Sequence, residues 1–405
     1  MPFKSAISGL KGAQTDLNVI GNNVANAGTT GFKRSRAEFR DVFAVSNTGS
    51  SANSTGRGVD IARIAQQFDQ GNISFTDNPL DLAISGSGFF MVEDQNSGRV
   101  YTRDGAFGLD RDGFIVNSNG QLLQAFGADA TGNITGALGP LQLSQANNPP
   151  QATTALSIGA NFDANAAPPT VPVFNPNDSN SFNETTALNI FDSQGGAHLL
   201  QTYFIRDAAV NTWQMHTYVD GNAVSGPDPL VFDGAGALQT PATGQVTIPT
   251  FTPGPGVNAM NLTMTLGSST MFGAAFGVNL VTQDGFTSGR LAGVDIDSNG
   301  VILARFTNGQ SVTQGQVALA NFPNTQGLRP LGDNLWADSF AAGVVLEGKP
   351  GTANLGLIQG GALEDSNVDL SRELVNLIIA QRNFQANTEV ISTADTVTQS
   401  VINIR

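Results

Sequence analysis

Three stretches of the sequence carry residues whose types and spacing could support chemistry. The first, GVVLEGKP at 343–350, contains the G-x-x-x-x-G-K pattern of a phosphate-binding loop. Such a loop needs Ser or Thr after the lysine to hold magnesium, and a helix that begins there to point backbone amides at phosphate. Pro350 and Gly351 follow Lys349 instead. The stretch therefore predicts no nucleotide site.

The second stretch matches the first half of a calcium-binding loop. Its four residues with the required spacing are Asp295, Asp297, Asn299 and Gly300. The twelfth position, where the loop needs a bidentate glutamate, is Phe306. We therefore expect a hairpin turn here, and we predict no metal site and no cofactor.

The third stretch combines positive charge with aromatic rings. Its basic residues are Lys33, Arg34, Arg36 and Arg40, and its aromatic residues are Phe32, Phe39 and Phe43. Such alternation suits single-stranded nucleic acid. The net charge of −14 opposes that partner, and the phenylalanine spacing fits one face of a helix. We interpret the basic residues as a solvated face or a contact between subunits, and we predict no nucleic-acid partner.

Catalytic side chains are scarce in this chain. It has no cysteine and only two histidines, His198 and His216. Without cysteine, the chain cannot form disulfides, thiolate metal sites or cysteine nucleophiles. With two histidines, it has few candidates for a catalytic triad. Paired carboxylates for glycoside hydrolysis are close in space rather than in sequence, so an enzyme of that kind stays an open alternative. Because most acidic residues stand in turns, we predict no catalytic residue and no enzyme.

The composition favours short strands and opposes a membrane protein. No run of eighteen apolar residues is present, so we expect no membrane insertion. The N-terminus has a lysine but no apolar segment, and we expect no cleaved signal peptide. Glycine accounts for 47 of 405 residues and only 13% are charged, which is typical of many strands joined by turns.

The elements that position these residues begin with an N-terminal helix. Apolar residues recur at spacings of three and four, with no proline from Phe3 to Val24. This spacing predicts an apolar seam of the coiled-coil type. Its residues are Ala6, Leu10, Ala13, Leu17, Ile20 and Val24. Because a lone helix of about twenty residues is marginally stable in water, we expect the seam to pack on another helix.

The C-terminal residues predict that second helix. Ser366 precedes Asp369 by three residues, which is the spacing of a capping box, and no glycine or proline follows Ala362. A helix of about 35 residues is about 50 Å long. Its apolar residues predict a second seam, formed by Leu370, Leu374, Leu377, Ile378, Phe384, Ile391, Ala394 and Val401.

Between the first helix and the rest of the chain lies GNNVANAGTTGFKRS at 21–35, which we interpret as an elbow. Asn18, Asn22 and Asn26 are four residues apart and form a polar stripe beside the seam, and a buried asparagine can fix helix register. We expect Gly28 to end the helix in the left-handed conformation. The elbow residues are Asn22, Asn23, Asn26, Gly28, Gly31 and Phe32, the last of which would anchor the next segment beneath the β domains.

The middle of the chain alternates apolar and polar residues between Asp-Gly and Asn-Gly pairs, which predicts hairpins. From Asp112 to Gly289 the only lysine or arginine is Arg206, against eleven acidic residues, so this block is compositionally distinct. The predicted fold is α+β and multidomain, with paired, coiled-coil-like terminal α-helices and nested, inserted all-β domains. The predicted parts are a helical domain of the two termini (1–27 with 366–405), a connecting segment (28–70), an inner β domain (71–146 with 286–365) and an outer inserted β domain (147–285).

Both ends of the chain resemble a known family. GNNVANAGTTGFKRSRAEF near the N-terminus and GALEDSNVDLSRELVNLIIAQRNFQAN near the C-terminus resemble the signatures of the axial proteins of the bacterial flagellum, the rod and hook subunits. The length of 405 residues and the stretch NIFDSQGGAHLLQTYF, with Trp213 downstream, resemble the hook members of that family.

This resemblance implies a structural subunit that self-assembles into a flexible tubular helical polymer, a universal joint that transmits torque from rod to filament. The terminal helices would form a polymerisation domain, with the two seams as polymerisation contacts, and would line the inner tube around the export channel. The β domains would form outer layers. The implied partners are further copies of the chain, the rod, the hook cap, the hook–filament junction and the flagellar type III export apparatus. The implied location is extracellular, in the hook and basal body of the flagellum.

Two other functions stay open at this point. Another axial subunit, such as that of the distal rod, would have the same ends, and a straight, stiff polymer would identify it. A secreted β-rich adhesin or glycan-binding protein would bind carbohydrate as a monomer and tolerate loss of both termini.

Overall fold

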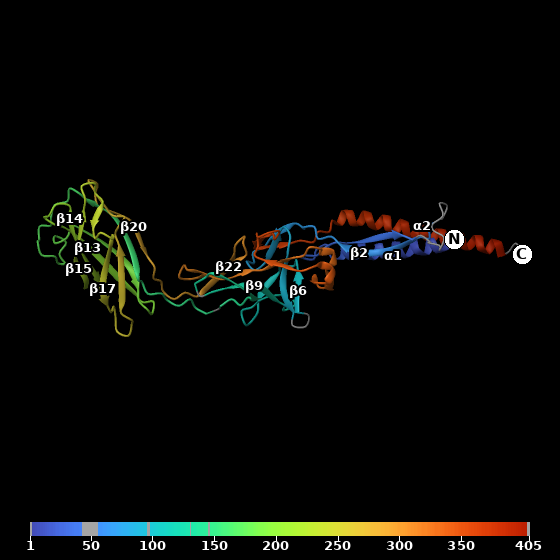
Figure 1. The fold of residues 1–405 in the computed structure, drawn as a ribbon, viewed down its shortest axis with the longest axis horizontal. Coiled ribbons are helices and arrows are strands. Elements are labelled where there is room, and N and C mark those ends of the chain that lie inside the picture. Colours follow the sequence, from blue (N-terminus) through green and yellow to red (C-terminus); the bar gives the residue numbers. More distant parts are fainter. Residues whose placement is uncertain (1, 43–55, 95–97, 130, 145, 403–405) are drawn as a thin grey trace. The chain divides into compact units, whose positions relative to one another are not determined.

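The structure, a computed structural model, describes residues 2–42, 56–94, 98–129, 131–144 and 146–402. In these residues the chain is mostly β and divides into two compact units. Unit 1 comprises Met1–Gln145, Gly293–Arg305 and Ser311–Arg405, and unit 2 comprises Ala146–Ala292 and Phe306–Gln310. Figure 1 shows that the blue and red ends of the chain both belong to the helical part of unit 1. The finer division into four parts stays a prediction.

The described residues form two α-helices, α1 (Pro2–Ala25) and α2 (Leu370–Ile402), which lie side by side in unit 1 (Figure 1). Asp369 caps α2, because its Oδ1 accepts a hydrogen bond from the backbone N–H of Arg372 at 3.2 Å. The predicted capping box at Ser366 is one turn too early, since the Ser366 hydroxyl accepts from the N–H of Val368 at 3.3 Å. Neither helix in the described part of the chain is apolar enough over its length to cross a membrane.

The seam expected on α1 lies on the packed side of that helix. Its buried members are Ala6, Ala13 and Ile20, and its half-buried members are Leu10, Leu17 and Val24. Gly9, beside the seam, allows α2 to approach closely, because a Cβ there would overlap the side chain of Asn387. Gly12 lies against the ring of Phe39, where an added Cβ would be at an ordinary contact distance of 3.4 Å. The coiled-coil form of the helix pair stays a prediction.

An antiparallel hairpin packs on α1 and consists of β1 (Ser35–Asp41) and β2 (Val59–Gln66). The prediction that Phe32, Phe39 and Phe43 share a helix face is wrong, because Phe39 is in β1. Phe43 lies outside the described residues. The segment SRAEFRD alternates charged and less polar residues, and this period of two suits a strand.

One sheet forms most of the β part of unit 1, with thirteen strands in the described residues. These strands are β5 (Phe89–Asp94), β6 (Gly98–Thr102), β7 (Phe107–Leu109), β8 (Ile115–Asn117), β9 (Leu122–Ala128), β10 (Ile134–Pro140), β21 (Leu291–Ile296), β22 (Val301–Phe306), β23 (Ser311–Val317), β24 (Leu319–Asn321), β25 (Arg329–Gly332), β26 (Leu335–Ala337) and β27 (Leu346–Gly348). Strands β9, β5 and β6 pair with β23, β24 and β26, so the outgoing chain is joined to the returning chain.

Two short antiparallel strand pairs also join a strand that precedes unit 2 in the chain to a strand that follows it. They are β3 (Ile73–Phe75) with β29 (Ala362–Glu364), and β4 (Leu82–Ser85) with β28 (Leu357–Gly360). Two 3-10 turns, η1 (Thr325–Gly327) and η2 (Phe340–Ala342), complete the unit. The returning chain therefore closes the same fold that the outgoing chain began.

The large sheet buries side chains on both faces at its centre. In β5, Phe90 and Val92 belong to one apolar core, and Phe89 and Met91 belong to another that includes Trp336. This split follows from the alternation of side chains along a strand. Unit 1 thus has a core that is separate from its helices.

The turn expected at the calcium-like stretch is present between β21 and β22. The Asp297 carboxylate accepts hydrogen bonds from the N–H groups of Asn299 and Val301, at 2.9 and 2.8 Å. Gly300 has a φ of +73°. These bonds inside the chain are the ordinary ones of an aspartate in a tight turn.

Unit 2 is a β-sandwich of two five-stranded sheets. One contains β11 (Ala155–Asp163), β17 (Gln245–Phe251), β18 (Met260–Thr265), β19 (Thr270–Phe272) and β20 (Gly277–Gln283), and the other contains β12 (Glu184–Phe191), β13 (Ala197–Arg206), β14 (Thr212–Val219), β15 (Asn222–Phe232) and β16 (Leu238–Thr240). Between the sheets, the ring of Phe162 lies 5.0 Å from that of Phe204 and 5.1 Å from that of Trp213. Alternate residues of β14 are buried, as a sheet with one inner face requires.

Candidate functional site

The first residues of the elbow, 21–25, are still helical, because α1 ends at Ala25. The N–H of Asn26 donates to the carbonyl of Asn22 at 3.1 Å, and the Thr29 hydroxyl donates to Oδ1 of Asn26 at 3.2 Å. These bonds close one more turn after the helix. Two of the predicted elbow residues, Asn22 and Asn26, therefore hold the helix end.

Gly31 rather than Gly28 takes the left-handed conformation in the elbow. The prediction for Gly28 is wrong, and the φ of Gly31 is +67°. A Cβ at Gly31 would lie 2.5 Å from the backbone nitrogen of Asp104, so glycine is needed there for space as well as for conformation. Its N–H donates to the carbonyl of Glu364 at 2.7 Å. The elbow is thus fixed to β29, which returns from the other end of the chain.

A buried group of charges lies directly after this turn. Nζ of Lys33 donates to Oε1 of Glu364 at 2.6 Å and to the carbonyl of Asp69 at 2.9 Å. Arg103 donates to the other oxygen of Glu364 at 3.1 Å, and the N–H of Gly71 donates to Oε1 at 2.8 Å. The interpretation of Lys33 as a solvated or intersubunit residue is wrong, since its side chain and that of Glu364 are fully buried.

Burial of these charges has a cost that Glu364 offsets. Burial lowers the pKa of Lys33 and of Arg103, and the charge of Glu364 acts against both shifts. The Arg103 guanidinium also donates to the carbonyl of Gly86 at 2.8 Å and lies over the ring of Phe89. We call Lys33, Glu364 and Arg103 the buried charge cluster. It joins the elbow, β29 and the residue after β6.

Asn23 is the buried asparagine of the helix end. Its side chain accepts from the N–H of Ser35 at 2.9 Å and donates to the carbonyl of Ser35 at 2.8 Å, so it pairs with the start of β1. Its Nδ2 also lies 3.4 Å from Oε2 of Glu373 on α2. In the predicted polar stripe, by contrast, Asn18 and Asn22 are exposed. Asn23 is therefore the asparagine placed to fix the register of α1.

Glu373 links the start of α2 to the elbow. Its Oε1 accepts from Arg34 at 3.4 Å, and the N–H of Arg34 donates to Oδ1 of Asn367 at 2.8 Å. Burial and the charge of Glu373 raise the pKa of Asp16 on α1. The two helices and the elbow thus share one polar network, which a search for apolar seams could not find.

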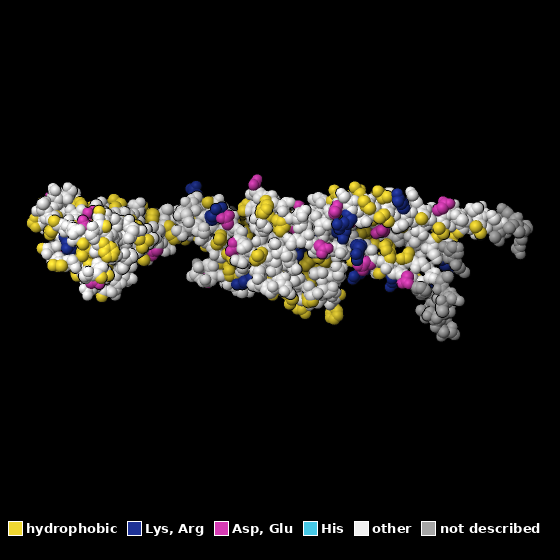
Figure 2. All heavy atoms as spheres, turned by 90° about the horizontal axis from the view of Figure 1, so that it is seen from above, with side chains coloured by type: hydrophobic (Ala, Val, Ile, Leu, Met, Phe, Trp, Pro, Cys, Tyr) yellow, Lys and Arg dark blue, Asp and Glu magenta, His cyan; other side chains and the backbone are white. Residues whose placement is uncertain are grey.

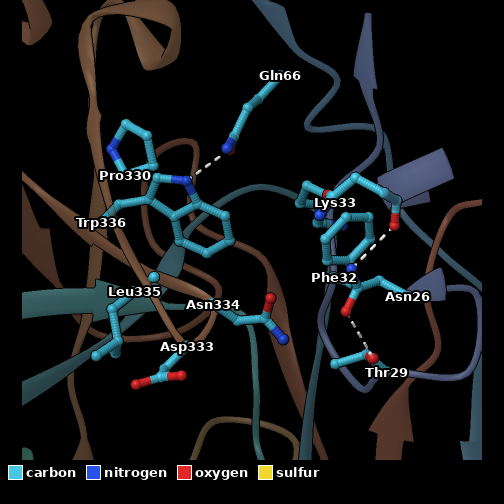
Figure 3. Close-up of a pocket in the computed structure, with 12 residues that line it drawn as sticks. Asn26, Thr29, Phe32, Lys33, Gln66, Pro330, Asp333, Asn334, Leu335 and Trp336 are labelled. Atoms are coloured by element: carbon cyan, nitrogen blue, oxygen red, sulfur yellow. Dashed lines mark hydrogen bonds between the residues drawn. The ribbon is translucent and has the colours of Figure 1, made fainter. Parts of the chain in front are cut away.

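A groove opens beside the elbow, and Figure 3 shows the side chains of Phe32 and Trp336 at it. The indole N–H of Trp336 donates to Oε1 of Gln66 at 2.5 Å, and Nδ2 of Asn334 donates to the carbonyl of Thr30 at 2.9 Å. Sequence reasoning missed the β25–β26 hairpin, although its two-residue turn consists of Asp333 and Asn334, residue types that adopt the positive φ they have here. In the part of the chain that the structure describes, no group of three or more His, Asp or Glu residues is placed to hold a metal ion.

The inward side of α2 differs from the predicted seam. Its inward residues follow a spacing of four and three and are Glu373, Leu377, Ala380, Phe384, Asn387, Ile391 and Ala394. Four of the eight predicted residues are among them. Three others, Leu370, Leu374 and Ile378, are about half exposed, and nothing is described for the side chain of Val401.

Two outward flanks of α2 are apolar. The first flank comprises Leu370, Leu374 and Ile378, and the second comprises Val375, Ile379, Val390 and Val397. Each set recurs on one side of a helix, and all seven side chains are 46–58% exposed. Figure 2 shows hydrophobic side chains along this helical end. Phe3 of α1 adds to an open apolar groove beside Val390 and Val397.

Four stretches of the chain match families of flagellar axial proteins. They are residues 3–33 (flagella basal body rod protein), 83–161 (flagellar hook protein FlgE/F/G D1 domain), 161–286 (flagellar basal body protein FlaE D2 domain) and 359–404 (flagellar basal body rod FlgEFG protein C-terminal). The chain is 38% identical to the flagellar hook protein FlgE of Escherichia coli and 36% identical to that of Salmonella typhimurium, over 100% of both chains in each case. The chain belongs to the flagellar hook protein family.

This membership confirms the resemblance of the two ends and makes the chain a component of the flagellar axial structure, whose hook is extracellular. The flagellar hook protein FlgE of Borreliella burgdorferi is 30% identical over 99% of this chain and 98% of its own. A crystal structure of the Helicobacter pylori flagellar hook protein FlgE2 has the same fold, with a TM-score of 0.55 and 16% identity over 72% of this chain and 100% of that one. Residues 21–33 of the elbow and the whole of α2 lie within the matched terminal stretches.

Proposed function

We propose that this chain is the repeating subunit of the flagellar hook and that its copies assemble, without catalysis, into a flexible tubular helical polymer. The observation that carries this proposal is the pair of apolar flanks on α2, which α1 leaves exposed. A helix that is apolar on several sides is stable when several neighbours bury it. Other copies of the chain supply those neighbours.

Two unlike flanks favour an open assembly over a closed one. A contact between different surfaces of identical subunits does not pair the subunits off but continues from copy to copy, and it generates a helix. The helix pairs would line the inner tube in this arrangement. Because the buried charge cluster fixes the elbow to β29, load on the helices passes into the β part of unit 1.

Bending of the tube is assigned to the β units. Unit 2 has its own core between two sheets, so it can keep its fold while its contacts with neighbouring copies change. Weak polar contacts between such units would let the outer layers slide while the helices hold the inner tube. We further propose the rod, the hook cap, the hook–filament junction and the flagellar type III export apparatus as partners.

The test replaces two residues of the first flank by Leu374→Asp and Ile378→Asp in one chain. Both side chains are half exposed in the single chain, so its melting temperature should stay close to that of the wild type. Buried charges between copies would prevent assembly. Sedimentation and electron microscopy of the concentrated protein should show tubes for the wild type and none for the variant.

The matched control adds the same two charges at exposed serines of α2, Ser371→Asp with Ser400→Asp, and should still form tubes. Curved tubes indicate a hook subunit, and straight, stiff ones indicate a rod subunit. If the Leu374 and Ile378 variant formed tubes, the first flank of α2 would not be a contact needed for assembly. A wild-type chain that stays monomeric at every concentration would overturn the polymer itself.

A further inference from the structure

A phenylalanine projects fully into solvent from the 3-10 turn η2. Phe340 is the most exposed large hydrophobic side chain in the described residues. An exposed aromatic ring on a loose loop would carry no argument, because single exposed apolar side chains are common. The turn that carries Phe340, however, is fixed at both ends.

The Ser339 hydroxyl fixes the start of this turn. It accepts from the N–H of Ala341 at 3.1 Å and donates to the carbonyl of Gly327 in η1 at 2.6 Å. Nδ2 of Asn324 donates to the carbonyl of Ala341 at 2.8 Å, so η1 and η2 are bonded to each other. The ring of Phe340 is therefore presented by an ordered, bonded turn.

Two further apolar residues close to Phe340 in the sequence are also exposed. Val344 is 80% exposed and Leu346 is 57% exposed, whereas Val345 between them packs on a core of unit 1. Leu346 is the first residue of β27, and Val344 lies two positions before it. We call Phe340, Val344 and Leu346 the Phe340 patch.

The patch has no charged member, but acids flank it in the sequence. Asp338 precedes it, and Glu347, which pairs with Arg99 at 2.8 Å, follows it. An exposed apolar patch with a polar rim is typical of a protein–protein contact. Each chain carries a net charge of −14, so copies repel one another and meet best at uncharged surfaces.

We propose that the Phe340 patch is a contact surface between copies of this chain, distinct from the flanks of α2, and that Phe340 is its anchor. This inference rests on the proposed function, because a homopolymer surrounds each copy with further copies. Aromatic residues in the centre of a contact contribute most of its binding energy. The occupant is thus an uncharged surface of a second copy.

The experiment uses the absence of cysteine in the chain. Phe340→Cys introduces a single thiol, whose reaction with a maleimide dye is measured in the monomer and in sedimented tubes. We expect labelling to be at least about tenfold slower in tubes. A benzophenone attached to the same thiol should yield crosslinked dimers from tubes upon illumination, and mapping of the linked peptide identifies the receiving surface.

Two variants keep the test independent of that cysteine. Phe340→Ser should raise the concentration needed for assembly, and Phe340→Leu, which keeps an apolar side chain, should raise it less. Since the ring is fully exposed in the single chain, both variants should have the same melting temperature as the wild type. A cysteine variant that melts normally and fails to form tubes would support the contact in the same way.

The outcomes separate this inference from the proposed function. Tubes in which the thiol reacts as fast as in the monomer, or in which only crosslinks within one chain form, would overturn the Phe340 contact and leave the polymer intact. Failure of the wild type to form tubes would overturn both.

Discussion

Glu364 lies between two buried cations, and this position makes its charge indispensable to unit 1. Its carboxylate accepts from Lys33, Arg103 and the N–H of Gly71. Removing one partner of a buried ion pair leaves an uncompensated charge, whereas the net value of the intact pair is small. The intact cluster therefore adds little net stability, and its role is to hold the elbow in position.

Glu364→Gln should destabilise unit 1 by about 3–5 kcal/mol, because Lys33 and Arg103 stay buried without a counter-charge. The chain has two tryptophans, Trp213 in unit 2 and Trp336 in unit 1. In a Trp213→Phe background, the fluorescence of Trp336 reports the unfolding of unit 1 alone.

The matched control for that variant is Glu38→Gln on strand β1. Glu38 also pairs with two arginines, Arg36 and Arg63, but both of these side chains are more than half exposed. Solvent screens such pairs, so the melting temperature should change little. Equal losses in the two variants would contradict the special role of burial at Glu364.

His198 gives unit 2 a dependence on pH. Its Nδ1 lies 2.6 Å from Oδ2 of Asp220 and its Nε2 lies 3.1 Å from Oδ2 of Asp192. Burial lowers the pKa of His198, but the hydrogen bonds and charges of the two carboxylates outweigh burial and raise this pKa above its ordinary value. The stabilisation is fully present below the unfolded pKa of about 6.5 and is lost as the pH rises through the folded pKa.

His198→Asn should therefore destabilise unit 2 at pH 5 to 6 and have a smaller effect at pH 8. The pKa of His216 is lowered by burial, so the effect of this residue on the pH dependence has the opposite sign. Because the wild type and the His198→Asn variant both contain His216, its contribution cancels in the comparison. Melting curves from the fluorescence of Trp213, in a Trp336→Phe background, measure the difference at each pH. A difference that is constant across this range would show that the ring contributes packing rather than charge.

At the scale of elements, the helix pair depends on a close approach at Gly9. A Cβ at this position would overlap the side chain of Asn387, whose Nδ2 bonds to the carbonyl of Asn383. Gly9→Leu should separate the helices and cost about 1–3 kcal/mol, as overpacking of a well-filled contact does. On heating, the helical circular dichroism signal of this variant should be lost at a lower temperature than the tryptophan fluorescence signals. That order would show that the destabilisation is in the α1–α2 pair.

Gly21 in the same helix provides the control, because nothing lies within 4 Å of an added Cβ there. Gly21→Ala should stabilise α1 by about 0.5–1 kcal/mol through lower backbone entropy in the unfolded chain. If Gly9→Leu behaved like Gly21→Ala, the two helices would not be in close contact at that point.

The helices and the nested strands could be predicted from local patterns. Spacings of three and four residues identify α1 and its packed side, since that helix has one apolar face. Turn residues and the change in charge identify the acidic block. These signals lie within short windows of the sequence, where periodicity is a reliable guide.

Long-range partners explain what local patterns could not predict. Helix α2 is apolar on several sides, so its spacing does not select the side that faces α1, and Glu373 and Asn387 lie inward because Asn23 and Gly9 are opposite them. Lys33 can be buried because it pairs with Glu364, and this partner is 331 positions away in the chain. Neither fact follows from the residues beside it.

At the scale of the whole molecule, the out-and-back path places both chain ends in one unit. Strand pairs such as β3 with β29 close unit 1 only after the chain has completed unit 2. The family matches follow the same order, with rod-type stretches at both ends and the D1 and D2 stretches between them. The assembling helices can thus be altered while the β parts keep their own cores.

Removal of residues 1–24 should test this separation. The cores around Trp213 and Trp336 include no residue of α1. Both tryptophans should stay buried and unfold cooperatively, with a small loss in unit 1 because Ser35 loses Asn23. The truncated chain should form no tubes at concentrations where the full chain does, since α2 then lacks the partner that holds its flanks in position. Tubes from the truncated chain, seen by electron microscopy, would show that assembly depends on the β units instead.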